Sequence, residues 1–142
     1  MKAYRAQLLS FDGHGQPVHD TDGLLLTAPD AHGTERVLAA GAWSALAHRL
    51  QAPEAQGVVV QHWPGKLIAP GFIDTHVHYP QLDVIGSPAD GLLPWLEQHT
   101  FPAEMRFADP AHAQAVATAF LDELQRNGVT TALAFATSHP AS

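Results

Sequence analysis

Two histidines separated by one residue, His76 and His78, are the pair in this sequence best suited to chemistry. On a β-strand, the side chains of residues i and i+2 point to the same face. Two imidazoles placed in this way can both reach one metal ion, at about 2.0–2.1 Å from each nitrogen. The alternative is a chance pair of surface histidines, because the chain holds ten histidines in 142 residues. The spacing indicates a metal site and leaves this alternative open.

The residues around the pair place it at the end of a strand. Phe72 to Val77 has the apolar character of a buried strand, and Tyr79-Pro80 ends it abruptly. Asp74 lies two residues before His76, where a carboxylate can orient the metal-binding region without touching the metal. The alternative for Asp74 is a strand-end carboxylate whose oxygens accept hydrogen bonds from backbone N–H groups.

Composition narrows the chemistry that is open to this chain. It has 14 acidic and 7 basic side chains, a net charge of −7 and no cysteine. The negative charge gives no surface for a nucleic-acid polymer. The lack of cysteine excludes disulfides, iron–sulfur clusters and thiolate zinc sites, including those of cytidine-type deaminases. No stretch approaches the roughly 18 apolar residues of a membrane span, and no signal peptide opens the chain. We expect a soluble, cytoplasmic protein without a membrane partner.

The second part of the chain, residues 66–142, has the pattern of a strand–helix–strand unit. Asp109 and Pro110 suit the N-cap and the first position of a helix, and Asn127-Gly128 suits its end. Val129 to Ala136 is a nearly continuous apolar run, which is typical of a strand covered on both faces. A strand, a helix and a second, parallel strand make one crossover unit.

The connection after the first of these strands is unusually long. A (β/α)8 barrel of about 250 residues uses roughly 31 residues for each unit, whereas about 58 separate Gly71 from Val129. The excess, about Tyr79 to Ala108, follows the strand directly and includes a short helical pattern at Leu92 to His99. In a barrel this face carries the active site, so we expect the insertion to form a pocket wall.

Residues 1–65 are expected to form a small β-rich module. Short apolar runs alternate there with turn residues such as Asp12-Gly13, and the spacing of apolar residues predicts a helix over Ala42 to Leu50. The expected strands are Tyr4–Phe11, Gly23–Thr27, Glu35–Ala40 and Gly57–Val60. Five scattered histidines are expected to be solvated: His14, His19, His32, His48 and His62.

Several segments of the second part are similar to those of a known enzyme family. Residues 70–78, with the sequence PGFIDTHVH, resemble the first barrel strand of the amidohydrolase superfamily. Within that superfamily, residues 78–81 (HYPQ), 93–97 (LPWLE), 100–104 (TFPAE) and 127–132 (NGVTTA) resemble the guanine deaminases. The resemblance covers about residues 66–140, and the TFPAE segment makes it specific. Residues 1–65 are compatible with the small β domain that precedes the barrel in these enzymes.

The resemblance implies a fold and a reaction. The fold class is α/β: a small N-terminal β-rich module (1–65), then the first two β/α units of an amidohydrolase-type (β/α)8 TIM barrel (66–142), with the barrel incomplete. His76 and His78 would be ligands of one Zn²⁺, and the Gln81 carboxamide would hydrogen-bond a purine, to which it offers donor and acceptor. The implied reaction is hydrolytic deamination of guanine to xanthine and ammonia, with a carboxylic acid moving the proton. The full-length enzyme is expected to be a homodimer.

The resemblance also places Trp95, Phe101 and His139 at the wall of the pocket. For Trp95 and Phe101 the alternative is packing in a core, and for Gln81 it is an ordinary loop position. We expect His139 to lie beside the pocket rather than to bind the metal. Glu104, in the same insertion, is expected to be a structural ion-pair partner, and the alternative implied by the resemblance is a place near the pocket.

A catalytic zinc site takes at least three protein ligands plus water, and the histidine pair supplies two. In the family, the other ligands and the proton-shuttling glutamate come from later strands, which would lie beyond Ser142, so no catalytic residue is assigned within the chain. We therefore expect the N-terminal piece of a longer enzyme, inactive by itself. The alternatives are an amidohydrolase that deaminates a different heterocycle and a non-catalytic truncated remnant.

Overall fold

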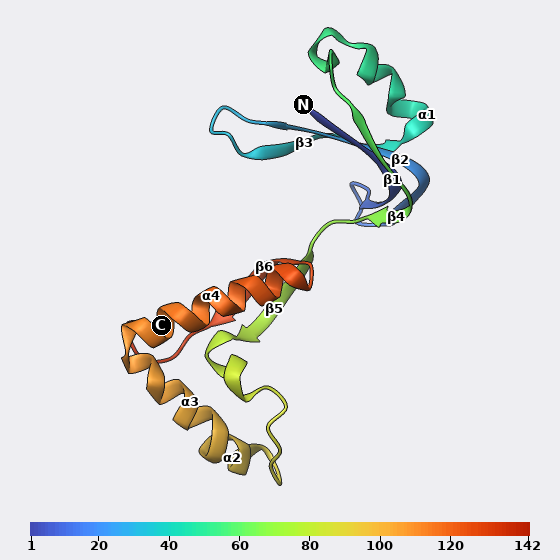
Figure 1. Ribbon diagram of the computed structural model, residues 1–142. Coiled ribbons are helices and arrows are strands. Elements are labelled where there is room, and N and C mark those ends of the chain that lie inside the picture. Colours follow the sequence, from blue (N-terminus) through green and yellow to red (C-terminus); the bar gives the residue numbers. More distant parts are fainter. The chain divides into compact units, whose positions relative to one another are not determined.

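The computed structural model describes residues 1–142, and the chain divides into two units, Met1–Pro70 and Gly71–Ser142. The first unit is built on a four-stranded sheet in the order β3-β2-β1-β4 (Figure 1). Its strands are β1 (Lys2–Phe11), β2 (Pro17–Pro29), β3 (Glu35–Ala42) and β4 (Val60–Ile68). β1 pairs antiparallel with β2 and parallel with β4, and β2 pairs antiparallel with β3. The unit is therefore mainly β.

An aspartate closes each of the two hairpin turns of this sheet. Asp12 Oδ1 accepts two backbone N–H groups of the β1–β2 turn, each at 2.8 Å. Asp30 Oδ1 accepts two N–H groups of the β2–β3 turn, at 2.9 and 3.0 Å. The other Asp30 oxygen pairs with Arg36 Nε at 2.9 Å. The Arg36 hydrogen bond, followed by those from the backbone, lowers the pKa of Asp30.

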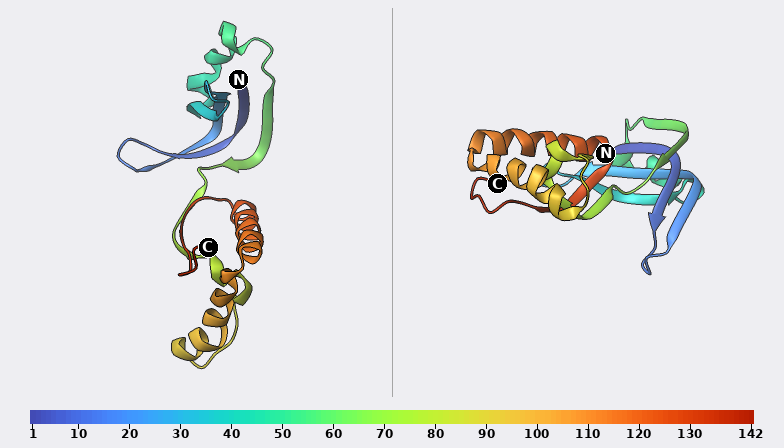
Figure 2. Two further views of the ribbon diagram at one scale, coloured as in Figure 1. Left: turned by 90° about the vertical axis from the view of Figure 1, so that its left-hand side faces the viewer. Right: turned by 90° about the horizontal axis from the view of Figure 1, so that it is seen from below.

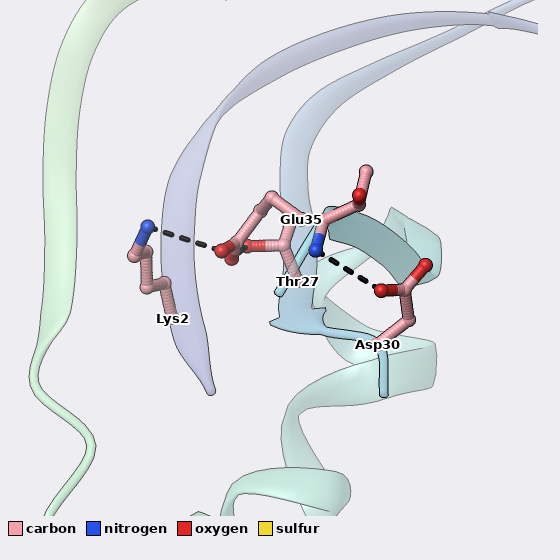
Figure 3. Close-up of polar contacts among 5 residues, drawn as sticks. Lys2, Thr27, Asp30 and Glu35 are labelled. Atoms are coloured by element: carbon pink, nitrogen blue, oxygen red, sulfur yellow. Dashed lines mark hydrogen bonds and ion pairs between the residues drawn. The ribbon is translucent and has the colours of Figure 1, made fainter. Parts of the chain in front are cut away.

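Two more carboxylates tie strands of the sheet together. Glu35 accepts hydrogen bonds from Thr27 Oγ1 and, at 3.2 Å, from Lys2 Nζ (Figure 3). Asp22 accepts two hydrogen bonds from the Arg5 guanidinium, both at 2.7 Å. Each set of donors favours the ionised carboxylate, so the pKa values of Glu35 and Asp22 lie below their ordinary range.

One face of the sheet is covered by the segment between β3 and β4. This segment contains the short helix α1 (Trp43–Leu46) and the 3₁₀ helices η1 (Ala47–Gln51) and η2 (Pro53–Ala55) (Figure 2). The buried sheet residues beneath it are Ala3, Leu24 and Leu26, and Trp43, Leu46 and Leu50 pack against them. The apolar residues that recur along this segment are therefore the ones that pack against the sheet.

The expected helix over Ala42 to Leu50 is wrong in its form, because only the four residues of α1 are α-helical. The following residues tighten into the 3₁₀ helix η1. Ala52 precedes Pro53 and is extended, with ψ of 149°, because the proline ring disfavours the α conformation in the preceding residue. The helical segment therefore ends at Gln51.

The strand β4 lies where the sequence suggests a turn. The expected strand ends at Val60, whereas β4 starts there and continues through Pro64-Gly65. Its pairing with β1 shifts register between Arg5 and Gln7, and Gly65 takes a φ of 69°. A bulge of this kind absorbs a proline and a left-handed glycine without ending the strand. β4 thus crosses residue 65 and stays within the first unit.

The second unit is a strand–helix–strand crossover. β5 (Phe72–His78) and β6 (Val129–Phe135) pair in parallel, and α4 (Pro110–Arg126) lies between them in the chain (Figure 1). The long connection from β5 to α4 is helical for much of its length. It comprises η3 (Tyr79–Val84), α2 (Leu92–Trp95), the π-helical turn η4 (Leu96–Thr100), α3 (Phe101–Met105) and η5 (Arg106–Ala108). The helical pattern expected to end at His99 thus continues to Met105.

The helix α4 begins and ends as its sequence predicts. Asp109 is the N-cap and accepts a hydrogen bond from the Ala111 N–H at 2.9 Å, and Gly128 follows the end with φ of 76°. Its buried face consists of Ala113, Val116 and Phe120. Phe107 is buried against this face, with Tyr79 packed beside it. No helix of the structure has the length and hydropathy needed to cross a membrane.

The expectation that β5 and β6 are buried is wrong for this chain. Phe72 and Ile73 are each 68% exposed, and Leu133 is 62% exposed. The reason is that each strand has a single pairing partner, and the one long helix packs against β6. An apolar run predicts a covered strand, but it is covered only when further elements supply the contacts.

Candidate active site

The imidazoles of His76 and His78 converge at the C-terminal end of β5. Their Nε2 atoms are 3.2 Å apart and their ring centroids 5.3 Å apart. Two nitrogens bound to one tetrahedral zinc at about 2.0–2.1 Å lie about 3.3 Å apart. The pair is therefore spaced as two ligands of one zinc ion would be. Without a metal, the same spacing lets one ring donate a hydrogen bond to the other.

The rest of the chain does not extend this pair into a full metal site. No group of three or more His, Cys, Asp or Glu side chains is arranged to hold a metal. Imidazole nitrogen is a good zinc ligand, so the donors fit zinc chemically as well as in distance. The residues present thus match two positions of a zinc site, and a catalytic site takes at least three protein ligands.

Asp74 acts on the backbone that carries the pair. Its Oδ1 accepts a hydrogen bond from the His76 N–H at 3.1 Å. The pairing of β5 with β6 is irregular between Asp74 and Val77, and the carboxylate supplies an acceptor to an amide within that irregular stretch. This geometry matches the backbone alternative for Asp74. Its effect is to hold the local conformation of β5 at His76.

Phe135, at the end of β6, contacts both imidazoles. Its ring centroid lies 4.7 Å from that of His76 and 4.9 Å from that of His78, and it stacks on the latter at 15°. Sequence reasoning missed this residue. The parallel register that pairs His78 with Phe135 is the signal that identifies it, and that register depends on the assembled sheet.

Gln81 lies in η3, three residues beyond the histidine pair, and its side chain is held by the insertion. Gln81 Nε2 donates a half-buried hydrogen bond to Glu104 Oε1 on α3, at 3.0 Å. The expectation that Glu104 is an ion-pair partner is wrong. The nearby cation, Arg106, pairs with Asp83 at 3.2 Å instead, which leaves Glu104 to the glutamine amide.

Glu104 also lines a small pocket of about 300 Å³. The pocket lies between α3 and the segment after β6, and its lining residues are Phe101, Glu104, Met105, Thr137, Ser138 and His139. Thr137 Oγ1 accepts the His139 N–H at 3.0 Å and so fixes the turn of that segment. Phe101 and His139 therefore share one pocket. Trp95 is half-buried on α2 and is not among its lining residues.

These groups gather because β5 and β6 are parallel. The carboxyl ends of parallel strands lie at the same edge of a sheet, and loops at that edge carry active sites in α/β proteins. The histidine pair ends β5, Phe135 ends β6, and Gln81 and His139 follow the two strands. The edge thus offers two metal-binding nitrogens, a fixed carboxamide and a pocket beside it.

Comparison with known proteins identifies the second unit. The model of the amidohydrolase family matches residues 67–141. This range contains every residue of the edge described above, from the histidine pair to His139, and more than half of the chain.

Relatives of known name match larger parts of the chain. Guanine deaminase of Escherichia coli is 46% identical over 102 residues, which cover 72% of this chain and 22% of that protein. A probable guanine deaminase of Deinococcus radiodurans is 38% identical over 148 residues, which cover 95% of this chain and 31% of that protein. The chain therefore spans between about a fifth and a third of the length of these relatives.

The fold agrees with these matches. The solved structure of E. coli guanine deaminase has a TM-score of 0.81 at 37% identity, and the match covers 99% of this chain and 32% of that one. The predicted fold class, a β-rich N-terminal part followed by the start of a β/α barrel, is confirmed by this likeness. On the family match over residues 67–141, this chain belongs to the amidohydrolase family.

Proposed function

We propose that the chain contributes two zinc ligands and a purine-binding carboxamide to a zinc-dependent guanine deaminase. The observation that carries the proposal is the 3.2 Å separation of the His76 and His78 Nε2 atoms at the carboxyl end of β5. The names of the E. coli and D. radiodurans relatives support guanine as the substrate. In this reaction, water replaces the exocyclic amine of guanine, and the products are xanthine and ammonia.

His76 and His78 would hold the zinc through Nε2, while Asp74 keeps the His76 backbone in place. Bound zinc supplies a Lewis acid that makes water a nucleophile at neutral pH. The two imidazoles must be neutral to bind metal. Because both side chains are exposed at the strand end, further ligands and water would have access to a metal held by them.

Gln81 would orient the purine, and Glu104 would determine which way its carboxamide faces. A carboxylate only accepts hydrogen bonds, so the amide nitrogen of Gln81 must face Glu104. The Gln81 oxygen, an acceptor, and its second N–H, a donor, are then free for other partners, and it is settled which side of the carboxamide carries each. A guanine edge that carries an N–H beside an acceptor atom matches such a donor–acceptor pair.

The decisive experiment uses the polypeptide encoded by the complete reading frame that contains these residues. We expect it to convert guanine to xanthine and ammonia, with adenine as the comparison substrate, and to lose activity on zinc chelation. His76→Ala and His78→Ala should each lower kcat/KM at least a hundredfold, about 2.7 kcal/mol, because each removes a zinc ligand. Gln81→Ala should mainly raise KM. His14→Ala, in the β1–β2 turn of the first unit, is the matched control. Full activity after both ligand substitutions would exclude the proposal.

Residues 1–142 by themselves should release no ammonia from guanine. The physical reason is that no third His, Asp or Glu is placed beside the histidine pair, and catalytic zinc takes three protein ligands. The measurement is ammonia release by the purified chain with and without added zinc. Zinc-dependent release would show that two imidazoles suffice or that another ligand is recruited.

A further inference from the structure

Phe135 is a large aromatic residue at a position where its side chain is only partly buried. Its side chain is 43% exposed, and aromatic residues bring most stability when they are buried. What distinguishes Phe135 is its neighbours. The centroid of its ring lies within 5 Å of the centroids of both imidazoles. Phe135 reaches them from β6 although it follows His78 by 57 residues in the sequence.

The arrangement of these three rings limits the orientations that the two imidazoles can take. His76 and His78 are exposed on β5, and an exposed side chain on a strand samples several staggered χ1 rotamers. Only some of those rotamers bring both Nε2 atoms to 3.2 Å. The Phe135 ring stacks on His78 at 15° and lies tilted by 40° against His76. One aromatic ring thus restricts both side chains at once.

We propose that Phe135 is a positioning residue for the metal-binding pair: its ring holds the imidazoles of His76 and His78 with their Nε2 atoms converging. It touches neither metal nor substrate and acts through the two histidines. The identity of the ion as zinc rests on the function proposed above, whereas the restriction of the two rings does not. Ligands held in the binding geometry bind more tightly because less freedom is lost on binding.

The first test measures zinc affinity on the 142-residue chain, by competition with a chromophoric zinc chelator. Phe135→Leu keeps an apolar side chain of similar bulk but removes the aromatic face, and we expect zinc to bind about tenfold more weakly, in line with the loss of two aromatic contacts. Phe135→Tyr keeps the ring and should retain the affinity of the unchanged chain. Leu133→Ala removes an exposed apolar side chain from the same face of β6 and is the matched control.

The second test needs no metal and separates the two proposals. In NMR spectra of the metal-free chain, the Hε1 protons of His76 and His78 should be shifted upfield by the Phe135 ring, and Phe135→Leu should abolish that shift. Amide exchange in β5 and β6 checks that the sheet persists in each variant. If the unchanged chain fails to bind zinc at the pair, the zinc assignment fails, and the ring shifts still decide the role of Phe135. Unchanged ring shifts, or unchanged zinc affinity in a folded Phe135→Leu chain that binds zinc, would overturn the role proposed for Phe135.

Discussion

Replacing Gly71 by alanine tests how closely β5 and β6 approach each other where they begin. A Cβ built at position 71 would lie 2.6 Å from the Cβ of Thr130, with Oγ1 and Cγ2 of Thr130 closer still. Rotating χ1 of Thr130 moves the two outer atoms but leaves its Cβ in place. The backbone of one strand must therefore shift, and overpacking of this kind typically costs about 1–3 kcal/mol.

Hydrogen exchange of the β5 and β6 amides measures this cost directly, because it reports local opening of the second unit. The Phe72 N–H, which donates to the Gly128 carbonyl at 2.8 Å, is the nearest reporter. A loss of about 1–3 kcal/mol corresponds to exchange about fivefold to 150-fold faster. Gly13→Ala is the matched control, since a Cβ at Gly13 would meet no atom within 4 Å and its φ is not in the left-handed region.

A second substitution shows whether the Thr130 side chain is the cause. Thr130→Gly removes all three clashing atoms, so the effect of Gly71→Ala should largely disappear in that background. Thr130→Ala retains the Cβ and should rescue only in part. Unchanged exchange in Gly71→Ala, or an equal penalty in the Thr130→Gly background, would refute the close approach as the reason for glycine at this position.

Two further predictions concern other parts of the chain. The pKa values of Asp22, Asp30 and Glu35 are lowered by hydrogen bonds, first among them those from Arg5, Arg36 and Thr27 respectively. A carboxyl group whose pKa falls on folding adds stability above its unfolded pKa of about 4 and loses it as the pH falls through the folded value. The urea concentration at the unfolding midpoint of the first unit, measured by amide exchange, should therefore fall when the pH is lowered below about 4. An equal midpoint at pH 7 and pH 3 would contradict this. The Gln81–Glu104 hydrogen bond should give a coupling energy of about 1–3 kcal/mol in a double-mutant cycle with alanine at each position, because its acceptor is charged. Additive effects of the two substitutions would show that the bond contributes nothing.

The second unit could be predicted from the sequence because its signals are local. Asp109 and Gly128 mark the two ends of α4, and the residues next to each are enough to interpret them. The alternation of side chains along a strand is equally local, and it places His76 and His78 on one face of β5 without any knowledge of the rest of the fold. These signals led to the strand–helix–strand unit and to the convergent pair.

The remaining features depend on contacts between distant segments. Phe135 meets the histidines only through the register of β5 with β6. Glu104 accepts a hydrogen bond from the amide of Gln81, which lies 23 residues earlier in the chain. Likewise, Pro64-Gly65 has the composition of a turn and becomes a bulge in β4 because β1 lies alongside. The residues around a position in the sequence do not show which distant segment will pack beside it.

The central claim is that His76 and His78 together bind one zinc ion, and a zinc titration of the chain followed by NMR of its histidines tests it most directly. The chain contains ten histidines, so eight internal controls are observed in the same spectrum. We predict that the ring signals of His76 and His78 move together and reach saturation at one zinc per chain, while the other eight stay in place. Movement of other histidines at lower zinc concentration, or a pair that does not respond, would contradict the claim.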